Sequence, residues 1–190
     1  ADMLIKKDSL IAIKTHFGEE GNTTHVSPKH IRVFVERVKA QGGMPYLTET
    51  SVLYKSRRMN AVAHTLLAYS HGFTFEAVGA PIIMSDGLRG NIEREITVNG
   101  DYYKEVPVAA DAVSPDAMIL VSHATGHLAA GIGAALKNLG MGLSSRKGKL
   151  NQHSKSKPHV KSDDCTACEA CIQNCPVDAI ALVDGKAKID

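Results

Sequence analysis

Four cysteines near the end of the sequence carry its most specific chemical signal. They are Cys165, Cys168, Cys171 and Cys175, and Pro176 follows the last of them in a C-x2-C-x2-C-x3-C-P run. Thiolates at this spacing are the ligands of [4Fe-4S] clusters. A tight loop with two residues between its thiolates can wrap one face of such a cluster and leave its backbone N–H groups free to point at the sulfurs. The sequence therefore predicts an iron–sulfur centre in this segment.

Two other uses of cysteine fit the pattern less well. Zinc sites usually combine two C-x2-C pairs separated by about a dozen residues or more, and the sequence has no such second pair outside the run. A disulfide framework would scatter its cysteines along the chain, whereas all four lie within this one motif. Because no disulfide is expected, the sequence indicates a reducing compartment, and we expect a cytoplasmic protein.

The fourth cysteine of the run points to a second cluster. In ferredoxins with two clusters, the cysteine at the position of Cys175 ligates the other cluster, and a reciprocal cysteine run lies about two dozen residues downstream. The sequence ends at Asp190, where that run would begin. We therefore expect these residues to be the front part of a longer protein, whose intact form holds two [4Fe-4S] clusters.

A second set of residues that could do chemistry consists of polar side chains that follow predicted buried strands. They are His16, Glu19 and His25 after the first strand, Glu49 after the second, Asp86 and Arg89 after the third, and His123 and His127 after the last. In open, mostly parallel sheets, ligands bind at the carboxyl ends of the strands. Each of these residues alone could also be a turn or capping residue. Their convergence at one edge of the sheet is the stronger indication of a binding site.

We expect four side chains to line one cavity at that edge and two more to reach it: His16, His123, His127, Lys137, Asp86 and Arg89. Neutral imidazoles suit nickel, iron or zinc, so a second metal could bind there, and they also shuttle protons near pH 7. A lysine beside cationic or apolar neighbours can lose its proton and become a nucleophile. An arginine supplies a fixed charge for a carboxylate or a phosphate.

The segment 122–142 is rich in glycine, with Gly126, Gly131 and Gly133 after the last predicted strand. A strand, a glycine-rich turn and a helix form the layout of a phosphate-binding loop, in which helix N–H groups point at an anion. We expect Lys137 to lie inside that helix. The segment matches neither the GxGxxG nor the Walker pattern. Close packing of a helix against the sheet through small residues explains it equally well.

Strands and helices alternate along the predicted fold. We expect strands at 10–14, 45–50, 81–87 and 117–121, helices starting at Pro28 and at Asn60, a short helix at 109–113, and a hairpin of 92–98 with 102–108 around Asn99-Gly100. Ser27 before Pro28 is a typical helix start, and Asn-Gly is a typical hairpin turn. Repeated strand–helix–strand units predict an α/β fold, with a mostly parallel sheet covered by helices.

Composition and charge narrow the function classes. Hydrophobic residues make up 44% of the chain, and its net charge of +2 argues against a dedicated nucleic-acid binder. No apolar run approaches the ~18 residues that span a bilayer, so no membrane association is expected. We expect an α/β domain at 1–143, a basic linker at 144–162, and the first half of a ferredoxin-like module at 163–190. The basic linker could steer an acidic partner such as a flavodoxin.

Several stretches together resemble an uncharacterised family, the domain of unknown function three-sixty-two, whose members are often labelled iron–sulfur centre proteins. The matching residues are 12–19, 21–24, 53–54, 86–90, 122–123, 126–127, 137–142, 148–149 and His153. This resemblance implies an α/β protein with a ferredoxin-like insert that carries two cluster motifs, followed by more α/β chain. It implies no settled activity.

A fainter resemblance is to the nickel-pincer lactate racemases. Their histidine, lysine and histidine are separated by nine and fifteen residues, as are His127, Lys137 and His153. In that family the lysine holds the pincer cofactor covalently, the later histidine ligates nickel, and the earlier one acts as acid or base. The resemblance implies the same roles here. Ala134 and Ala135 depart from the family's glycines at their positions, and the wider sequence differs.

These observations favour an electron-transfer protein. The clusters would pass single electrons between a redox partner of the ferredoxin or flavodoxin type and an unknown small molecule at the carboxyl edge of the sheet. One alternative is a metal- or pincer-dependent isomerase in which the cluster is structural. Another is a phosphate or nucleotide binder that uses the glycine-rich turn. The sequence leaves all three open.

Overall fold

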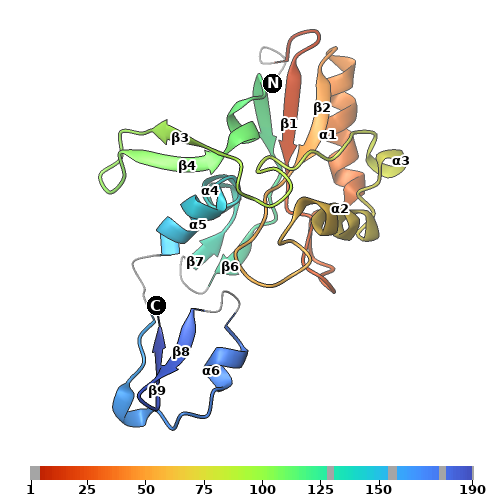
Figure 1. Ribbon diagram of the computed structural model, residues 1–190. Helices are drawn as coiled ribbons and strands as arrows, with labels where there is room; N and C mark the ends of the chain where they lie inside the picture. Colours follow the sequence, from red (N-terminus) through yellow and green to blue (C-terminus); the bar gives the residue numbers. More distant parts are fainter. Residues whose placement is uncertain (1–4, 128–130, 154–157, 176–178, 190) are drawn as a thin grey trace. The chain divides into compact units, whose positions relative to one another are not determined.

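The computed structural model describes residues 5–127, 131–153, 158–175 and 179–189 (Figure 1). The chain forms two compact units, residues 1–150 and residues 151–190. Each unit has its own strands and helices. Pro176 of the cysteine run lies outside the described residues.

A parallel sheet of three strands forms the centre of the first unit. Its strands are β1 (Leu10–Lys14), β2 (Met44–Thr48) and β5 (Ala117–Leu120), in the order β2-β1-β5. β1 pairs with both neighbours in parallel, with Lys14 opposite Thr48 on one side and opposite Leu120 on the other. The three strands therefore end at the same edge, and the predicted α/β class is confirmed.

The core lies around β1 and the helix that covers it. Ile11 and Ile13 of β1 are fully buried, as expected for a central strand with both faces covered. Helix α1 (Pro28–Ala40) buries Ile31, Val35 and Val38 at helical spacing and packs along β1 and β2 (Figure 1). Phe17, Leu47 and Phe73 belong to one apolar cluster with Ile13, Ile31 and Val35.

The helix starts predicted from local sequence are confirmed. The Ser27 side chain accepts a hydrogen bond from the Lys29 N–H, and Pro28 is the first residue of α1. Helix α2 (Ala61–Ser70) begins after Asn60, whose side chain accepts from the Ala63 N–H. A short helix, α3 (Phe75–Val78), follows.

The strand predicted at 81–87 was wrong in extent. The segment makes a single parallel bridge, between Leu47 and Ile82, and three backbone hydrogen bonds along β2 and Glu49. It then turns away, because Gly87 adopts a positive φ of 73° and the Ile92 N–H bonds back to the Asp86 carbonyl. The chain leaves the sheet before a regular strand can form.

The predicted hairpin is present with a longer connection. β3 (Glu93–Thr97) pairs with β4 (Glu105–Ala109) in an antiparallel ladder, and residues 98–104 join them. A 3-10 turn, η1 (Ala110–Val113), stands where the short helix was predicted. β5 was predicted to be strongly buried, and its four residues are only half-buried. β5 is an edge strand of the sheet, so only one of its sides has a neighbour.

The glycine-rich segment does not form a strand–turn–helix unit. A two-stranded antiparallel ladder of β6 (Thr125–His127) with β7 (Gly131–Gly133) stands between β5 and helix α4 (Ala135–Gly140). Lys137 lies in α4, as predicted. The next helix, α5 (Arg146–His153), occupies part of the range predicted to be a linker.

Gly148 explains why α5 packs closely on β4. A Cβ atom at this glycine would lie 2.2 Å from the Pro107 carbonyl oxygen. The backbone N–H of Ser145, just before α5, donates to the same oxygen. The start of α5 therefore belongs to the first unit.

The second unit consists of the cysteine loop and a hairpin. Its elements are η2 (Ser162–Asp164), α6 (Ala170–Gln173), β8 (Ile180–Val183) and β9 (Lys186–Ile189), and β8 pairs with β9 in an antiparallel ladder. Asp184 and Gly185 form the turn, both with positive φ. Among the described residues of the whole chain, no helix combines the length and apolarity required to cross a membrane.

Candidate functional site

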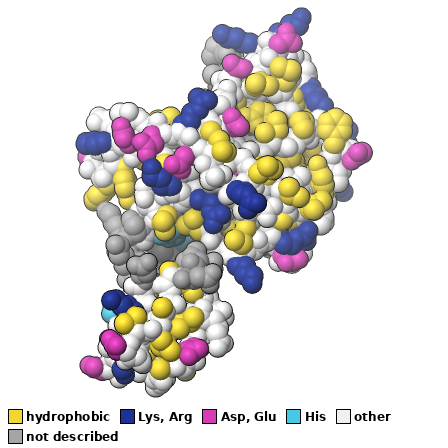
Figure 2. All heavy atoms as spheres, in the orientation of Figure 1, with side chains coloured by type: hydrophobic (Ala, Val, Ile, Leu, Met, Phe, Trp, Pro, Cys, Tyr) yellow, Lys and Arg dark blue, Asp and Glu magenta, His cyan; other side chains and the backbone are white. Residues whose placement is uncertain are grey.

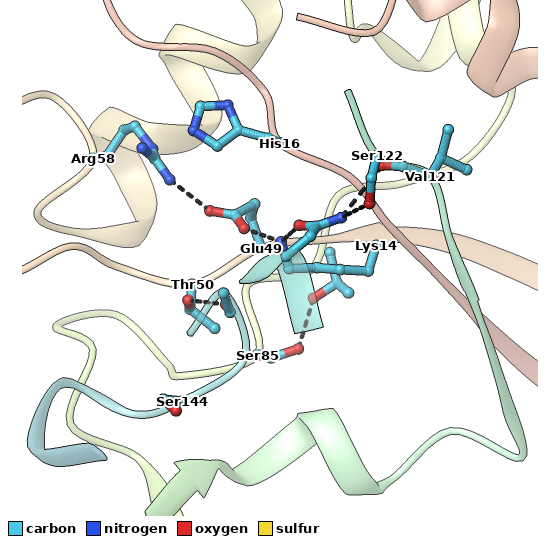
Figure 3. Close-up of polar contacts among 12 residues, drawn as sticks. Lys14, His16, Glu49, Thr50, Arg58, Ser85, Val121, Ser122 and Ser144 are labelled. Carbon is cyan, nitrogen blue, oxygen red and sulfur yellow. Dashed lines mark hydrogen bonds and ion pairs between the residues drawn. The ribbon is translucent and has the colours of Figure 1, made fainter. Parts of the chain in front are cut away.

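A buried ionic cluster lies where β1 and β2 end (Figure 3). Lys14 is the last residue of β1, and Glu49 directly follows β2; both are buried. The Lys14 ammonium contacts Oε1 of Glu49. On the other side, Nη2 of Arg58 lies 2.8 Å from Oε2 of Glu49. One carboxylate therefore bridges two buried cations.

The parallel register brings the cluster together. Because Lys14 is opposite Thr48, the residues that follow both strands meet at one edge of the sheet. Arg58 lies in the loop before α2, and its guanidinium also contacts a second carboxylate. Nη1 of Arg58 lies 2.5 Å from Oε1 of Glu19 and 3.3 Å from the Tyr54 hydroxyl.

The field of the two cations keeps Glu49 ionised. Burial alone would favour the neutral acid, but Lys14 and Arg58 hold the pKa of Glu49 well below its usual range. The carboxylate is therefore charged across the physiological pH range. Burial lowers the pKa of Lys14, and the neighbouring Glu49 carboxylate opposes that shift. Glu19 contacts Arg58 at the rim of the cluster.

Two histidines flank the cluster in their neutral form. Nε2 of the buried His64 accepts a hydrogen bond from Nε of Arg58 at 3.3 Å. Burial, only partly opposed by Glu49, lowers the pKa of His64 to about 4. His16 accepts from the Gly18 N–H through Nδ1, at 2.8 Å, and loss of hydration and the Arg58 charge lower its pKa. Since His16 is exposed, water screens part of the Arg58 field at its ring.

A chain of hydrogen bonds joins the cluster to α4 and to the residues that follow β5. Lys14 donates to Oδ1 of Asn138 at 2.7 Å, and Nδ2 of Asn138 donates to the Ser122 hydroxyl at 3.0 Å. Figure 3 shows this path from Lys14 to Ser122. Asn138 is the residue after Lys137, and Ser122 is the residue before His123. These hydrogen bonds therefore hold the backbone next to two predicted site residues, Lys137 and His123.

A second polar group continues along the same edge. The buried Lys149 donates to the Thr50 hydroxyl at 2.7 Å, and that hydroxyl donates to the Gly142 carbonyl at 2.5 Å. Oδ2 of Asp86 accepts from the Ser51 N–H at 2.6 Å. The residues after β2, the segment after Ile82 and helix α5 thus meet at the edge where ligands bind in α/β sheets.

The structure brings two of the predicted site residues together around Gly133. A Cβ atom at Gly133 would lie 3.9 Å from Cβ of His127 and 3.9 Å from Cδ of Lys137. A Cβ atom at Gly126 would meet nothing within 4 Å, so no close approach requires a glycine there. Gly131 adopts a positive φ of 73°, which favours glycine.

The other predicted residues lie in different surroundings. Asp86 is buried beside Ser51, whereas His123 and Arg89 are exposed. His153 is the last residue of α5 and is also exposed. Sequence reasoning missed Lys14, Arg58 and Lys149. Lys14 offered one signal, a charge at the end of an apolar strand; Arg58 and Lys149 offered none.

One hollow among the described residues is apolar, and none of the charged residues above lines it. It has a volume of about 490 Å³ and is lined by Ala61, Val62, Thr65, Leu66, Ile82, Met84, Gly87 and Leu88. Figure 2 shows hydrophobic side chains gathered on the side of the first unit that carries α1, α2 and α3. The predicted shared cavity does not coincide with this hollow.

In the second unit, backbone N–H groups point at cysteine sulfurs. Sγ of Cys165 accepts from the Ala187 N–H at 3.3 Å, and Sγ of Cys175 accepts from the Ala179 N–H at 3.3 Å. The Ala187 hydrogen bond, with a smaller contribution from the neighbouring Ala167 N–H, lowers the pKa of Cys165. These donors favour the thiolate, which is the form that binds iron.

The loop is also shaped around these thiols. Hydrogen bonds from the Ala170 N–H and the Thr166 hydroxyl lower the pKa of Cys168. Ala167 and Glu169 adopt positive φ values of 56° and 59°, which ordinary residues rarely do. Within the described residues, no three His, Cys, Asp or Glu side chains already stand at metal-binding distances. The donor set and its N–H groups nevertheless have the chemistry that an iron–sulfur cluster requires.

Comparison with known proteins identifies one family. The family model described as Domain of unknown function (DUF362) matches residues 11–187. No curated protein and no solved structure matches the chain. The family match covers nearly the whole sequence, including both the sheet and the cysteine loop.

Proposed function

The chain belongs to the DUF362 family, and we propose that it is an iron–sulfur protein that passes single electrons to or from a ligand at the carboxyl edge of its parallel sheet. The observation that carries this proposal is the pair of N–H···S hydrogen bonds to Cys165 and Cys175 within the C-x2-C-x2-C-x3-C run. Such bonds recur around iron–sulfur clusters and tune their reduction potentials.

Cys165, Cys168 and Cys171 would hold one [4Fe-4S] cluster, and Cys175 would serve the second cluster of the intact protein. A [4Fe-4S] cluster supplies one-electron chemistry when bound. The protein's own contribution is to stabilise thiolates before iron arrives, since backbone donors lower the pKa of both Cys165 and Cys168. A reducing cytoplasm would keep these thiols available.

The ligand would bind at the charged edge of the first unit. Lys14, Glu49 and Arg58 form a buried cluster there, and the exposed His16 stands beside it. A redox partner of the ferredoxin or flavodoxin type would exchange electrons with the cluster. The chain between Ser144 and Ser162 contains six Lys and Arg residues and no acid. Apart from the buried Lys149, these charges would steer an acidic partner.

The test is anaerobic reconstitution with iron and sulfide. Full-length protein should bind about eight irons per chain, with broad absorbance near ~400 nm. Cys171→Ser should remove about four of these irons by loss of the first cluster, and Cys175→Ser about four by loss of the second. A stable zinc stoichiometry without iron uptake would refute the proposal.

Cluster potential separates electron transfer from the alternatives. A reversible low-potential couple in a redox titration supports transfer. A cluster that stays silent across the biological range would instead be structural, which is what the metal- or pincer-dependent isomerase requires. In that case, intact-mass measurement of protein from its native host should show an adduct on Lys137 that Lys137→Ala abolishes.

A further inference from the structure

Helix α5 carries a buried lysine with no charged partner. Lys149 is 7% exposed, and its Nζ donates to two neutral acceptors, the Thr50 hydroxyl at 2.7 Å and the Ser144 carbonyl at 2.6 Å. Within the described part of the chain, no carboxylate lies at ion-pair distance from this nitrogen. A buried ammonium without a carboxylate is costly, so the amine is driven toward its neutral form.

Lys147, two residues earlier on the same helix, provides the contrast. It is exposed, and its Nζ lies 2.8 Å from Oε1 of Glu95, which raises its pKa. Burial, only partly opposed by Glu49 and Asp86, lowers the pKa of Lys149 to about 8. About a tenth of Lys149 is therefore neutral at pH 7, whereas an ordinary lysine is almost wholly charged.

Two further polar atoms in this region are buried without a well-placed hydrogen-bond partner. Oδ1 of Asp86 and Oγ of Ser51 make no hydrogen bond of ordinary geometry in the described structure, although both residues are fully buried. The Ser51 side chain lies close enough to the Asp86 carboxylate to oppose the rise in its pKa. The two residues are joined through the Ser51 N–H, and Ser51 directly follows the Thr50 that binds Lys149. Buried polar groups without such a partner destabilise the fold. A ligand that offers one donor and one acceptor would give each of the two atoms a partner.

Arg146 adds a cation beside the serine. A Cβ atom at Gly90 would lie 2.7 Å from Cβ of Ser51 and 2.8 Å from Cδ of Arg146, so both side chains line the space that this glycine leaves open. Arg146 is half-buried, and in the part of the chain that the structure describes its guanidinium donates a single long hydrogen bond, of 3.5 Å, to the Arg89 carbonyl. Its remaining donors suit a carboxylate.

We propose that Lys149, Ser51 and Asp86 form a carbonyl-binding site that takes a small oxo acid as a Schiff base on Lys149. The neutral amine would add to the carbonyl carbon, and its proton would move to the carbonyl oxygen to give a carbinolamine. Asp86 would donate a proton to the departing hydroxyl, which leaves as water. The product is a positively charged imine beside the Asp86 carboxylate, with the acid group of the ligand held by Arg146.

The chemistry of each residue fits its part. A lysine that loses its proton easily is the usual Schiff-base nucleophile. Burial raises the pKa of Asp86, which makes it a better proton donor near neutral pH. The site lies within the first unit and needs no iron. Its test is therefore independent of the test for the iron–sulfur cluster.

The experiment uses the full chain, glyoxylate as the oxo acid, and sodium cyanoborohydride to trap the imine, followed by peptide mass mapping. At pH 7, Lys149 should gain the carboxymethyl mass at least about tenfold faster than Lys147, because far more of its amine is neutral. Lys149→Arg should abolish the adduct at that position, and Asp86→Asn should slow its formation. Acetaldehyde, which has no acid group, should react more slowly, and Arg146→Gln should remove that difference.

Two controls keep the test independent of folding. Lys147→Ala should leave labelling of Lys149 unchanged. In the unaltered chain, the ratio of Lys149 labelling to Lys147 labelling should be constant below about pH 8 and should shrink above it, because the amine of Lys149 is then already neutral whereas that of Lys147 is still charged. If Lys149 stays unlabelled, or is labelled no faster than Lys147, the proposal is overturned.

Discussion

Replacement of Glu49 by Gln should strongly destabilise the first unit. The substitution keeps the side chain's shape and removes the one carboxylate that contacts Lys14 within the described residues, while Arg58 keeps Glu19. Removal of one partner of a buried ion pair costs roughly 3–5 kcal/mol, because the other charge stays buried and uncompensated. At about 2–4 °C per kcal/mol for a chain of this size, the melting temperature should fall by roughly 10 °C.

A second substitution shows whether the stranded ammonium causes the loss. Lys14→Met combined with Glu49→Gln removes both charges of the pair, so the double variant should recover at least about 1 kcal/mol relative to Glu49→Gln alone. Glu36→Gln is the matched control. Glu36 pairs with Arg32 on the exposed face of α1, and such surface pairs contribute about 0–1 kcal/mol.

Urea unfolding followed by circular dichroism measures these free energies, and their pH dependence gives an independent check. The folded pKa of Glu49 lies below its ordinary value of 4.5, so its stabilisation is complete above pH 4.5 and is lost as the pH falls below it. The unaltered chain should therefore lose stability in acid more steeply than Glu49→Gln, by up to about 1.4 kcal/mol per pH unit. Equal slopes, or a double variant less stable than Glu49→Gln, would refute the bridging role of Glu49.

Two further substitutions test neighbouring features. The pKa of His64 is about 4 in the folded chain, so protonation of His64 favours the unfolded chain as the pH falls from 6.5 to 4. His64→Gln should therefore reduce the loss of unfolding free energy in that pH range. An unchanged slope would show that His64 does not titrate there. Gly148→Ala places a methyl group against the Pro107 carbonyl; it should cost about 1–3 kcal/mol and speed hydrogen exchange in α5, whereas Gly126→Ala, in open space, should change neither.

The predictions from sequence succeeded where the signal is local. Ser27 before Pro28 and Asn60 before α2 each act on the backbone within a few residues, so their helices begin where the sequence predicts. The extent of 81–87 and the burial of β5 depend on neighbours that are distant in sequence. The first segment leaves the sheet at Gly87, and the second occupies an edge. Apolar runs alone do not distinguish these positions from central strands.

The residues of the candidate site show the same difference between local signals and contacts that are distant in sequence. The rule that ligands bind at strand ends directed attention to His16, Glu49 and Asp86, which lie at the carboxyl edge. The rule did not predict Arg58, because the position of Arg58 depends on the fold of the loop before α2. It did not predict Lys149 either, because the helix of Lys149 lies in a range with the composition of a linker. Both reach the edge only through tertiary contacts.

The cost of the buried charges argues that they serve function. Well-packed hydrophobic residues often replace a buried ion pair with no loss of stability, because desolvation offsets the attraction between the charges. The first unit nevertheless buries Lys14, Arg58 and Lys149 with Glu49 and Asp86 at one edge of its sheet. It also leaves Oδ1 of Asp86 unpaired. A core selected for stability alone would not keep this arrangement, whereas an edge that binds and orients a charged ligand requires fixed charges held in place before the ligand arrives.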